Sequence, residues 1–150
     1  ACTLDAPGAQ GVCAFFDPKK EYSTSTLRVR CGNGHAALLA VALDGKPLAE
    51  SERVLAQLGT ECRPEGWKET PAKVKAGKDM IDGFKLESHG KAPWRVEKGD
   101  CKVAIRNRVL RRATACGPDG RAAGEVETRR DDKGLSFRFP PEALYVVLRK

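Results

Sequence analysis

The sequence predicts a mainly β protein. We expect a single domain of residues 1–150 with antiparallel strands arranged as a meander or as sandwich-like sheets, at most one or two short helices, and disulfide staples. Three observations support this class. Apolar and polar residues alternate with a period of two over several short segments, Gly, Pro and Asp interrupt these segments at short intervals, and six cysteines are spread over the chain. A chain of this length buries roughly 68–70% of its unfolded surface, which is enough for a core.

The N-terminal part of the chain predicts three strands. Residues 12–16 form a short apolar run that ends at Asp17-Pro18, because proline fixes φ and lacks an N–H donor. Residues 23–31 alternate strictly, with Thr24, Thr26, Arg28 and Arg30 on one face and Ser25, Leu27, Val29 and Cys31 on the other. A glycine-rich turn at residues 31–35 then leads into a buried strand at residues 36–43, which predicts a hairpin.

The middle of the chain predicts a helix and a long exposed connection. Residues 47–59 place several apolar side chains near one helical face, with Gly59 available to end the helix. Residues 63–79 are polar and contain two prolines and two glycines, so we expect an exposed connection there. Residues 80–87 alternate as a strand and lead into a polar turn at residues 88–91.

The C-terminal third carries the clearest β pattern. Strands are expected at residues 94–97, 101–106, 109–116, 121–130, 135–139 and 144–148, separated by turns rich in Gly, Asp and Pro. Strands joined by such short connections normally pair in sequence and antiparallel. We therefore expect a meander.

The six cysteines predict export to an oxidising compartment. They stand at Cys2, Cys13, Cys31, Cys62, Cys101 and Cys116, too far apart in sequence for the short-spaced pairs of zinc sites and redox motifs. Two or three structural disulfides in a periplasm or outside the cell are the simplest interpretation. Order along the chain favours Cys2 with Cys13, Cys31 with Cys62 and Cys101 with Cys116, although six cysteines allow fifteen pairings. The opening Ala1-Cys2-Thr3 is typical of an exported protein whose signal peptide has been removed.

Charge and composition favour an acidic partner. The chain has 27 Lys and Arg against 20 Asp and Glu, a net charge of +7, and nine aromatic residues, five Phe, two Tyr and two Trp. So few aromatic side chains argue against a platform for single-stranded nucleic acid. The longest apolar run, residues 36–43, is far shorter than the roughly 20 residues that span a bilayer, so we expect no membrane insertion.

The sequence lacks the motifs of common enzyme sites. His35 and His89 are the only histidines, and no phosphate-binding loop, nucleophile elbow or H-E-x-x-H motif is present. A cysteine–histidine nucleophile would need a free thiol beside one of these histidines. We therefore expect no enzymatic activity, no metal and no cofactor.

Two segments are candidate binding sites. Arg106, Arg108, Arg111 and Arg112 form the densest basic run, which either meets phosphate or an acidic protein or is a solvated edge strand. The second candidate is Ser88-His89-Gly90, predicted as a small projecting tip that could enter a cleft, or as an ordinary hairpin loop. The charged residues that bracket this tip are Lys85, Glu87 and Lys91.

The segment Lys85-Leu86-Glu87-Ser88-His89-Gly90 resembles the inhibitory loop of immunity proteins. Gram-negative bacteria such as pseudomonads keep these proteins in the periplasm against peptidoglycan amidases of type VI secretion. The resemblance implies that Ser88 hydrogen-bonds the catalytic histidine of a cysteine–histidine amidase, in a complex of one monomer with one effector. Two alternatives stay open: an exported basic β module that binds an anionic polymer or ligand, and a lysozyme inhibitor.

Overall fold

The computed structural model describes all residues from 1 to 150 and confirms an antiparallel all-β fold. The chain forms two compact units. The first comprises Ala1–Thr60 and Lys98–Lys150, and the second is the segment Glu61–Glu97. We retain the expectation of one folding domain as a prediction, because the second unit is a two-stranded sheet, and such hairpins are only marginally stable alone.

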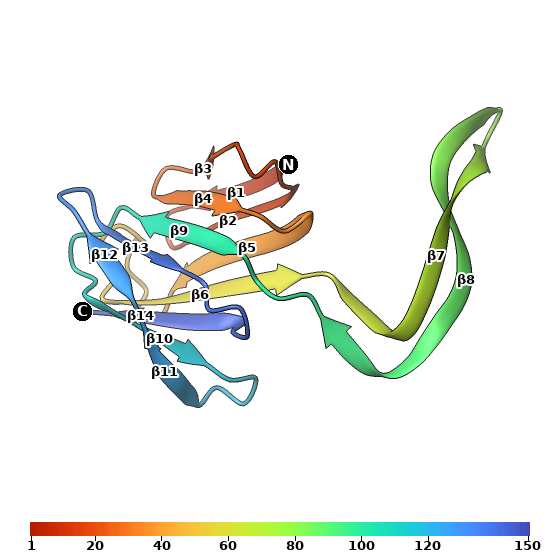
Figure 1. Ribbon diagram of the computed structural model, residues 1–150. Helices are drawn as coiled ribbons and strands as arrows, with labels where there is room; N and C mark the ends of the chain where they lie inside the picture. The colour runs from red at the N-terminus through yellow and green to blue at the C-terminus, as the bar shows by residue number, and fades with distance from the viewer. The chain divides into compact units, whose positions relative to one another are not determined.

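The larger sheet of the first unit has seven antiparallel strands (Figure 1). In spatial order these are β1 (Cys2–Ala6), β2 (Ala9–Phe15), β5 (His35–Ala42), β6 (Arg53–Thr60), β14 (Tyr145–Arg149), β10 (Arg112–Cys116) and β11 (Ala122–Val126). The C-terminal strand β14 lies between β6 and β10, so the predicted meander is interrupted by pairings between segments distant in sequence.

The smaller sheet has five antiparallel strands, and its central strand is β9. In spatial order they are β12 (Thr128–Arg130), β13 (Leu135–Arg138), β9 (Cys101–Ile105), β4 (Leu27–Cys31) and β3 (Tyr22–Ser23). Strand β9 pairs with β4, which precedes it by about seventy residues, and with β13. Neither pairing connects strands that follow each other directly in the chain.

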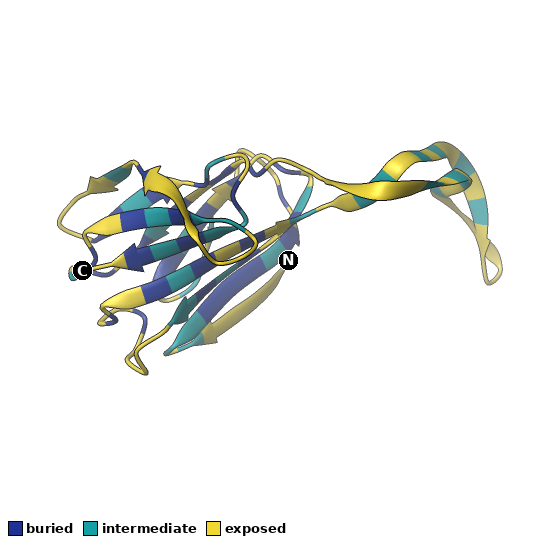
Figure 2. Cartoon of the chain, turned by 90° about the horizontal axis from the view of Figure 1, so that it is seen from below, coloured by how far each residue is buried: buried dark blue, intermediate teal, exposed yellow.

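The inner faces of the two sheets form one core. In the smaller sheet Val29, Val103 and Phe137 stand opposite one another and are all buried. In the larger sheet the corresponding row is Val12, Leu38 and Leu58. Figure 2 shows the resulting alternation of buried and exposed residues along the strands. Each such side chain contributes about 1.5–3 kcal/mol by leaving water, so alternate residues of every central strand must face inward.

The prediction of a helix at residues 47–59 is wrong. A turn occupies its first residues, where the amides of Glu50 and Ser51 donate to the carbonyl of Pro47, and strand β6 occupies the rest. The buried residues of β6, which are Val54, Ala56 and Leu58, recur every second position. Pairing of β6 with both β5 and β14 therefore overrides the weak helical pattern of its apolar residues.

Residues 63–79 are exposed as predicted, but the prediction that they form an irregular connection is wrong. They form strand β7 (Cys62–Ala76), which a turn at Gly77 and Lys78 joins to strand β8 (Asp79–Val96). Gly77 has a φ of +67°, which glycine tolerates without strain. Prolines 64 and 71 fit because β7 has a partner on one side only. No residue of either strand is fully buried in this unit (Figure 2).

One disulfide joins Cys31 to Cys101, and it corrects the pairing expected from chain order. The two residues stand opposite each other at the ends of β4 and β9, with their Cα atoms 4.2 Å apart. Cys62 and Cys116 are free and therefore do not pair with Cys31 and Cys101. Cys2 and Cys13 are opposite each other in β1 and β2 but carry free thiols. Register across the sheet, which the sequence does not reveal, decides which cysteines meet.

We expect the Cys31–Cys101 disulfide to be the main covalent stabiliser of the sandwich. Its sequence separation is 70 residues, and closing a loop of that size restricts the unfolded chain by about 4 kcal/mol in the chain-entropy model. Replacing both cysteines by alanine should lower the free energy of unfolding by about that amount in urea titrations. The matched control replaces the exposed Cys62 by alanine and should leave stability unchanged. Equal losses in the two variants would contradict the prediction.

Candidate functional site

The outer face of the five-stranded sheet gathers basic side chains in two rows. Arg30, Lys102 and Arg138 stand opposite one another on β4, β9 and β13. The parallel row runs through Arg28 on β4, Ala104, Ser136 and Arg129 on β12. On β4, β9 and β13 the next residues along the strand are buried in the core, so period-two alternation turns these side chains outward. Arg129 stands opposite Ser136 and therefore shares its face. Five cations from four neighbouring strands thus share one face.

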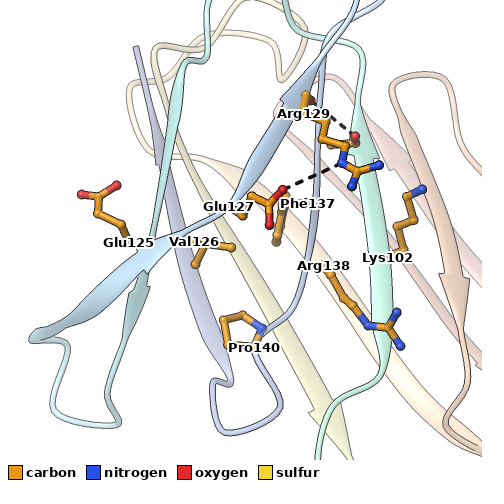
Figure 3. A pocket seen from close by; sticks show the side chains of 9 residues that line it. Lys102, Glu125, Val126, Glu127, Arg129, Phe137, Arg138 and Pro140 are labelled. Carbon is orange, nitrogen blue, oxygen red and sulfur yellow. Dashed lines mark hydrogen bonds and ion pairs between the residues drawn. The ribbon is translucent and has the colours of Figure 1, made fainter.

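Two hollows lie on this face and together form a groove. One, of about 480 Å³, is lined by Lys102, Glu125, Val126, Glu127, Arg129, Ser136, Phe137, Arg138 and Pro140 (Figure 3). The other, of about 340 Å³, is lined by Glu21, Arg28, Arg30, Lys102, Ala104, Asp131 and Ser136. They share Lys102 and Ser136, so they adjoin each other across the sheet. The short side chains of Ala104 and Ser136 form the bottom of the groove, and the longer basic side chains around them form its sides.

Some cations of the groove have carboxylate partners and others have none. Arg30 pairs with Glu21 at 3.2 Å, Arg129 lies 4.0 Å from Glu127 (Figure 3), and Arg138 pairs with Asp100. These exposed ion pairs contribute little to stability.

Lys102 and Arg28 are the cations of the groove without an ion pair. Lys102 has no ion-pair partner, and the Nε atom of Arg28 is buried without a hydrogen bond. A buried donor left unpaired costs about 1–3 kcal/mol.

A tight turn forms one wall of the groove at residues 131–134. Oδ1 of Asp131 accepts hydrogen bonds from the amides of Lys133 at 2.8 Å and Gly134 at 3.0 Å. A Cβ atom on Gly134 would lie 2.1 Å from the carbonyl oxygen of Ile105, so only glycine allows this close approach to β9. The two amides, then the charges of Lys133 and Arg28, hold the pKa of Asp131 below its usual range.

The predicted basic run does not form one strand. Arg106, Arg108 and Arg111 lie on the connection from β9 to β10, which leaves the five-stranded sheet and enters the seven-stranded one, and Arg112 begins β10. The interpretation of this run as a solvated edge strand is therefore wrong. Their main-chain path is instead fixed by an asparagine in the same connection.

Asn107 is buried and uses its side chain fully. Its Nδ2 donates to the carbonyls of Leu48 and Ser51, both at 2.8 Å, and its Oδ1 accepts from the amides of Val109 and Leu110. This residue ties the connection between the sheets to the turn before β6. Sequence reasoning passed over it because an asparagine among arginines is typical of a surface loop.

The Ser88-His89-Gly90 segment is part of strand β8 and does not form a projecting tip. Ser88 Oγ accepts a hydrogen bond from the amide of Gly90 at 3.1 Å, and the His89 ring meets the Trp67 ring edge-on at 6.3 Å. Gly90 has a φ of +65°, and an added Cβ would lie 2.5 Å from the Glu65 carbonyl oxygen. The strand register shifts on either side of this segment, which is typical of β-bulges. The predicted turn is thus a bulge within the hairpin.

The charged neighbours of this bulge also lie on β8. Lys85 and Glu87 form an ion pair at 3.3 Å, and Lys91 stands opposite Glu65 on β7. The residues at the hairpin turn itself are Gly77 and Lys78. The predicted position of the hairpin turn is therefore about ten residues too far along the chain. The sequence Ser-His-Gly-Lys is a stronger turn signal than the single glycine at position 77.

The two candidate sites of the sequence analysis therefore differ from the groove found here. The signal for the groove was present, because Arg28 and Arg30 share one predicted face of residues 23–31. Lys102 likewise alternates with the apolar residues of its strand. The missing information was that β4 and β9 are neighbours, which places these cations side by side.

No protein-family model, curated protein or solved structure shows significant similarity to this chain. The structure contains no helix of the length and apolarity needed to cross a membrane. Fold and site together define a disulfide-bonded antiparallel β-sandwich with a basic groove across its smaller sheet.

We expect the Asp131 turn to be sensitive to acid. Because the pKa of Asp131 is lowered in the folded state, its contribution to stability is present above the pKa of the unfolded chain and is lost as pH falls through the folded value. A carboxyl-carbon NMR titration should place the pKa of Asp131 below that of an ordinary aspartate, and Arg28→Gln should raise it. A midpoint at or above the ordinary value would contradict the hydrogen-bond assignment.

Proposed function

We propose that this protein is an exported, non-catalytic binding module whose ligand is an acidic polysaccharide. The observation that carries the proposal is the groove in which Lys102, which has no ion pair, lies beside four arginines. The Cys31–Cys101 disulfide supports an oxidising compartment such as a periplasm.

The shape of the groove favours an extended ligand. Its two hollows adjoin at Lys102 and Ser136 and cross four strands from β4 to β12. Neighbouring strands are about 4.8 Å apart, so the cations of one row repeat at that spacing. A polymer with regularly repeated carboxylates can contact several cations at once, whereas a single small anion can contact only part of a row.

The acidic residues of the groove favour a ligand that also carries hydroxyl groups. Glu125 and Glu127 line the first hollow, and Glu21 lines the second. Carboxylates accept hydrogen bonds from sugar hydroxyls but repel a chain that bears only phosphates. The aromatic residue among those that line the groove, Phe137, is only 3% exposed, so its ring is not available to stack on a nucleic-acid base.

Reversing the charge of two cations of the groove should weaken binding to an acidic polysaccharide. We expect the Lys102→Glu/Arg138→Glu variant of the full chain to bind polygalacturonate at least about tenfold more weakly, corresponding to roughly 1.4 kcal/mol. The matched control is Arg121→Glu, which changes a cation that is 89% exposed on the turn before β11. Isothermal calorimetry measures both.

Salt and competing polymers test the ligand class. Binding should weaken as ionic strength rises to about 1 M, where the screening length shrinks to about 3 Å. Single-stranded DNA and neutral dextran should bind more weakly than polygalacturonate. Equal losses in the groove variant and the Arg121 control, or tighter binding of DNA, would overturn the proposal. If only the Arg106→Glu/Arg108→Glu variant bound polygalacturonate more weakly, the binding site would lie on the connection between the sheets and not in the groove.

The second unit supports a second candidate function, which is binding to a protein. Its strand β8 exposes Met80 at 60%, Phe84 at 63% and Trp94 at 63%. Aromatic and methionine side chains are enriched at protein interfaces. The partner implied by the resemblance of residues 85–90 is a secreted cysteine–histidine amidase of the cell wall, which an immunity protein would block. This proposal does not depend on the basic groove.

Two substitutions on β8 test the immunity proposal. Ser88→Glu places a bulky charge in the bulge and should weaken inhibition of a peptidoglycan amidase, and Phe84→Ser should weaken it by removing an exposed apolar contact. The matched control, Lys78→Glu, alters charge at the hairpin turn. Circular dichroism establishes that each variant is folded. Unchanged inhibition by Ser88→Glu would exclude this segment from the inhibitory contact.

A further inference from the structure

A pair of free thiols and a histidine meet on one face of the larger sheet. Cys2 on the edge strand β1 stands opposite Cys13 on β2, and Sγ of Cys13 lies 3.8 Å from Nε2 of His35 on β5. The ring of Phe15 packs against His35 with centroids 4.9 Å apart. Cys2 is exposed and Cys13 is partly buried, so small molecules can reach the pair.

Cys2 and Cys13 have the same relation in their ladder as the two cysteines of the disulfide already present. Residues directly opposite each other in an antiparallel ladder have Cα atoms about 4.5–5.5 Å apart, within the range of about 4.4–6.8 Å that disulfides adopt. Cys31 and Cys101, which form a disulfide, are likewise directly opposite each other on neighbouring antiparallel strands. Cys62 and Cys116 have no cysteine opposite them in their ladders.

We propose that Cys2, Cys13 and His35 form a thiol-modification site that reacts with low-molecular-weight disulfides and closes into a second cross-strand disulfide. Cys13 is the nucleophile, because its sulfur has the imidazole nitrogen of His35 within reach. Cys2 is the resolving thiol. The site does not include the basic groove, so this proposal does not depend on the proposed function.

The reaction balances with a small-molecule disulfide as the oxidant. Nε2 of His35 takes the thiol proton of Cys13, and the thiolate attacks one sulfur of the disulfide, whose S–S bond breaks to release one thiolate. The product is a mixed disulfide on Cys13. Cys2, as thiolate, then attacks the Cys13 sulfur and expels the second small thiolate. Two protein thiols are oxidised and one small disulfide is reduced to two thiols.

The experiment uses the full chain with Cys62→Ser/Cys116→Ser, which leaves only this pair reactive. After incubation with oxidised glutathione, peptide mapping by mass spectrometry should find a bond between Cys2 and Cys13. Adding Cys2→Ser should stop the reaction at a glutathione adduct on Cys13. Adding Cys13→Ser should abolish the fast reaction, since it removes the thiol within reach of His35.

The role of His35 is tested by rate. His35→Gln keeps a polar side chain of similar length without a basic nitrogen and should slow modification of Cys13 about tenfold or more. The matched control is His89→Gln on β8, whose ring contacts Trp67 and no thiol. Faster modification of Cys2 than of Cys13, no bond between them, or equal rates in the two histidine variants would each overturn the proposal.

Discussion

Leu27, Val29 and Val103 lie in a core that excludes water, and their burial fixes the direction of every neighbour on the same strands. Successive side chains of a strand point to opposite faces. The residues between and beside them, Arg28, Arg30 and Lys102, have no other direction than outward. The groove is therefore a consequence of core formation, and a slip of one residue in register would destroy both together.

The position of β4 beside β9 is the second requirement of the groove, and two distant contacts maintain it. The Cys31–Cys101 disulfide joins the ends of these strands next to Arg30 and Lys102. Asn107 fixes the chain just after β9, where it leaves for the other sheet. A covalent constraint thus acts at one end of β9 and a hydrogen-bonded constraint at the other. Strand β9 is the central strand of the sheet that carries the groove.

The local alternation of apolar and polar residues predicted the fold class but not which strands lie next to each other in the sheets. Alternation correctly identified strands within residues 23–31 and 101–106, because one buried face leaves its signature in consecutive residues. It failed at residues 47–59, where burial at every second position of β6 comes from pairing on both sides. The cysteine pairing and the groove both depend on which strands are adjacent, and β4 and β9 are too far apart in sequence for local pattern to reveal it.

Ion pairs in the groove order its arginines for the ligand we propose and do not cancel its charge. Glu21 and Asp100 hold Arg30 and Arg138 extended across the sheet face, so a ligand need not order these long side chains on binding. Each guanidinium has five N–H donors, of which one exposed carboxylate uses only part. The remaining donors, with the unpaired Lys102, face the solvent. Preorganised cations around a low floor of Ala104 and Ser136 are what distinguish this face from a surface that is merely basic.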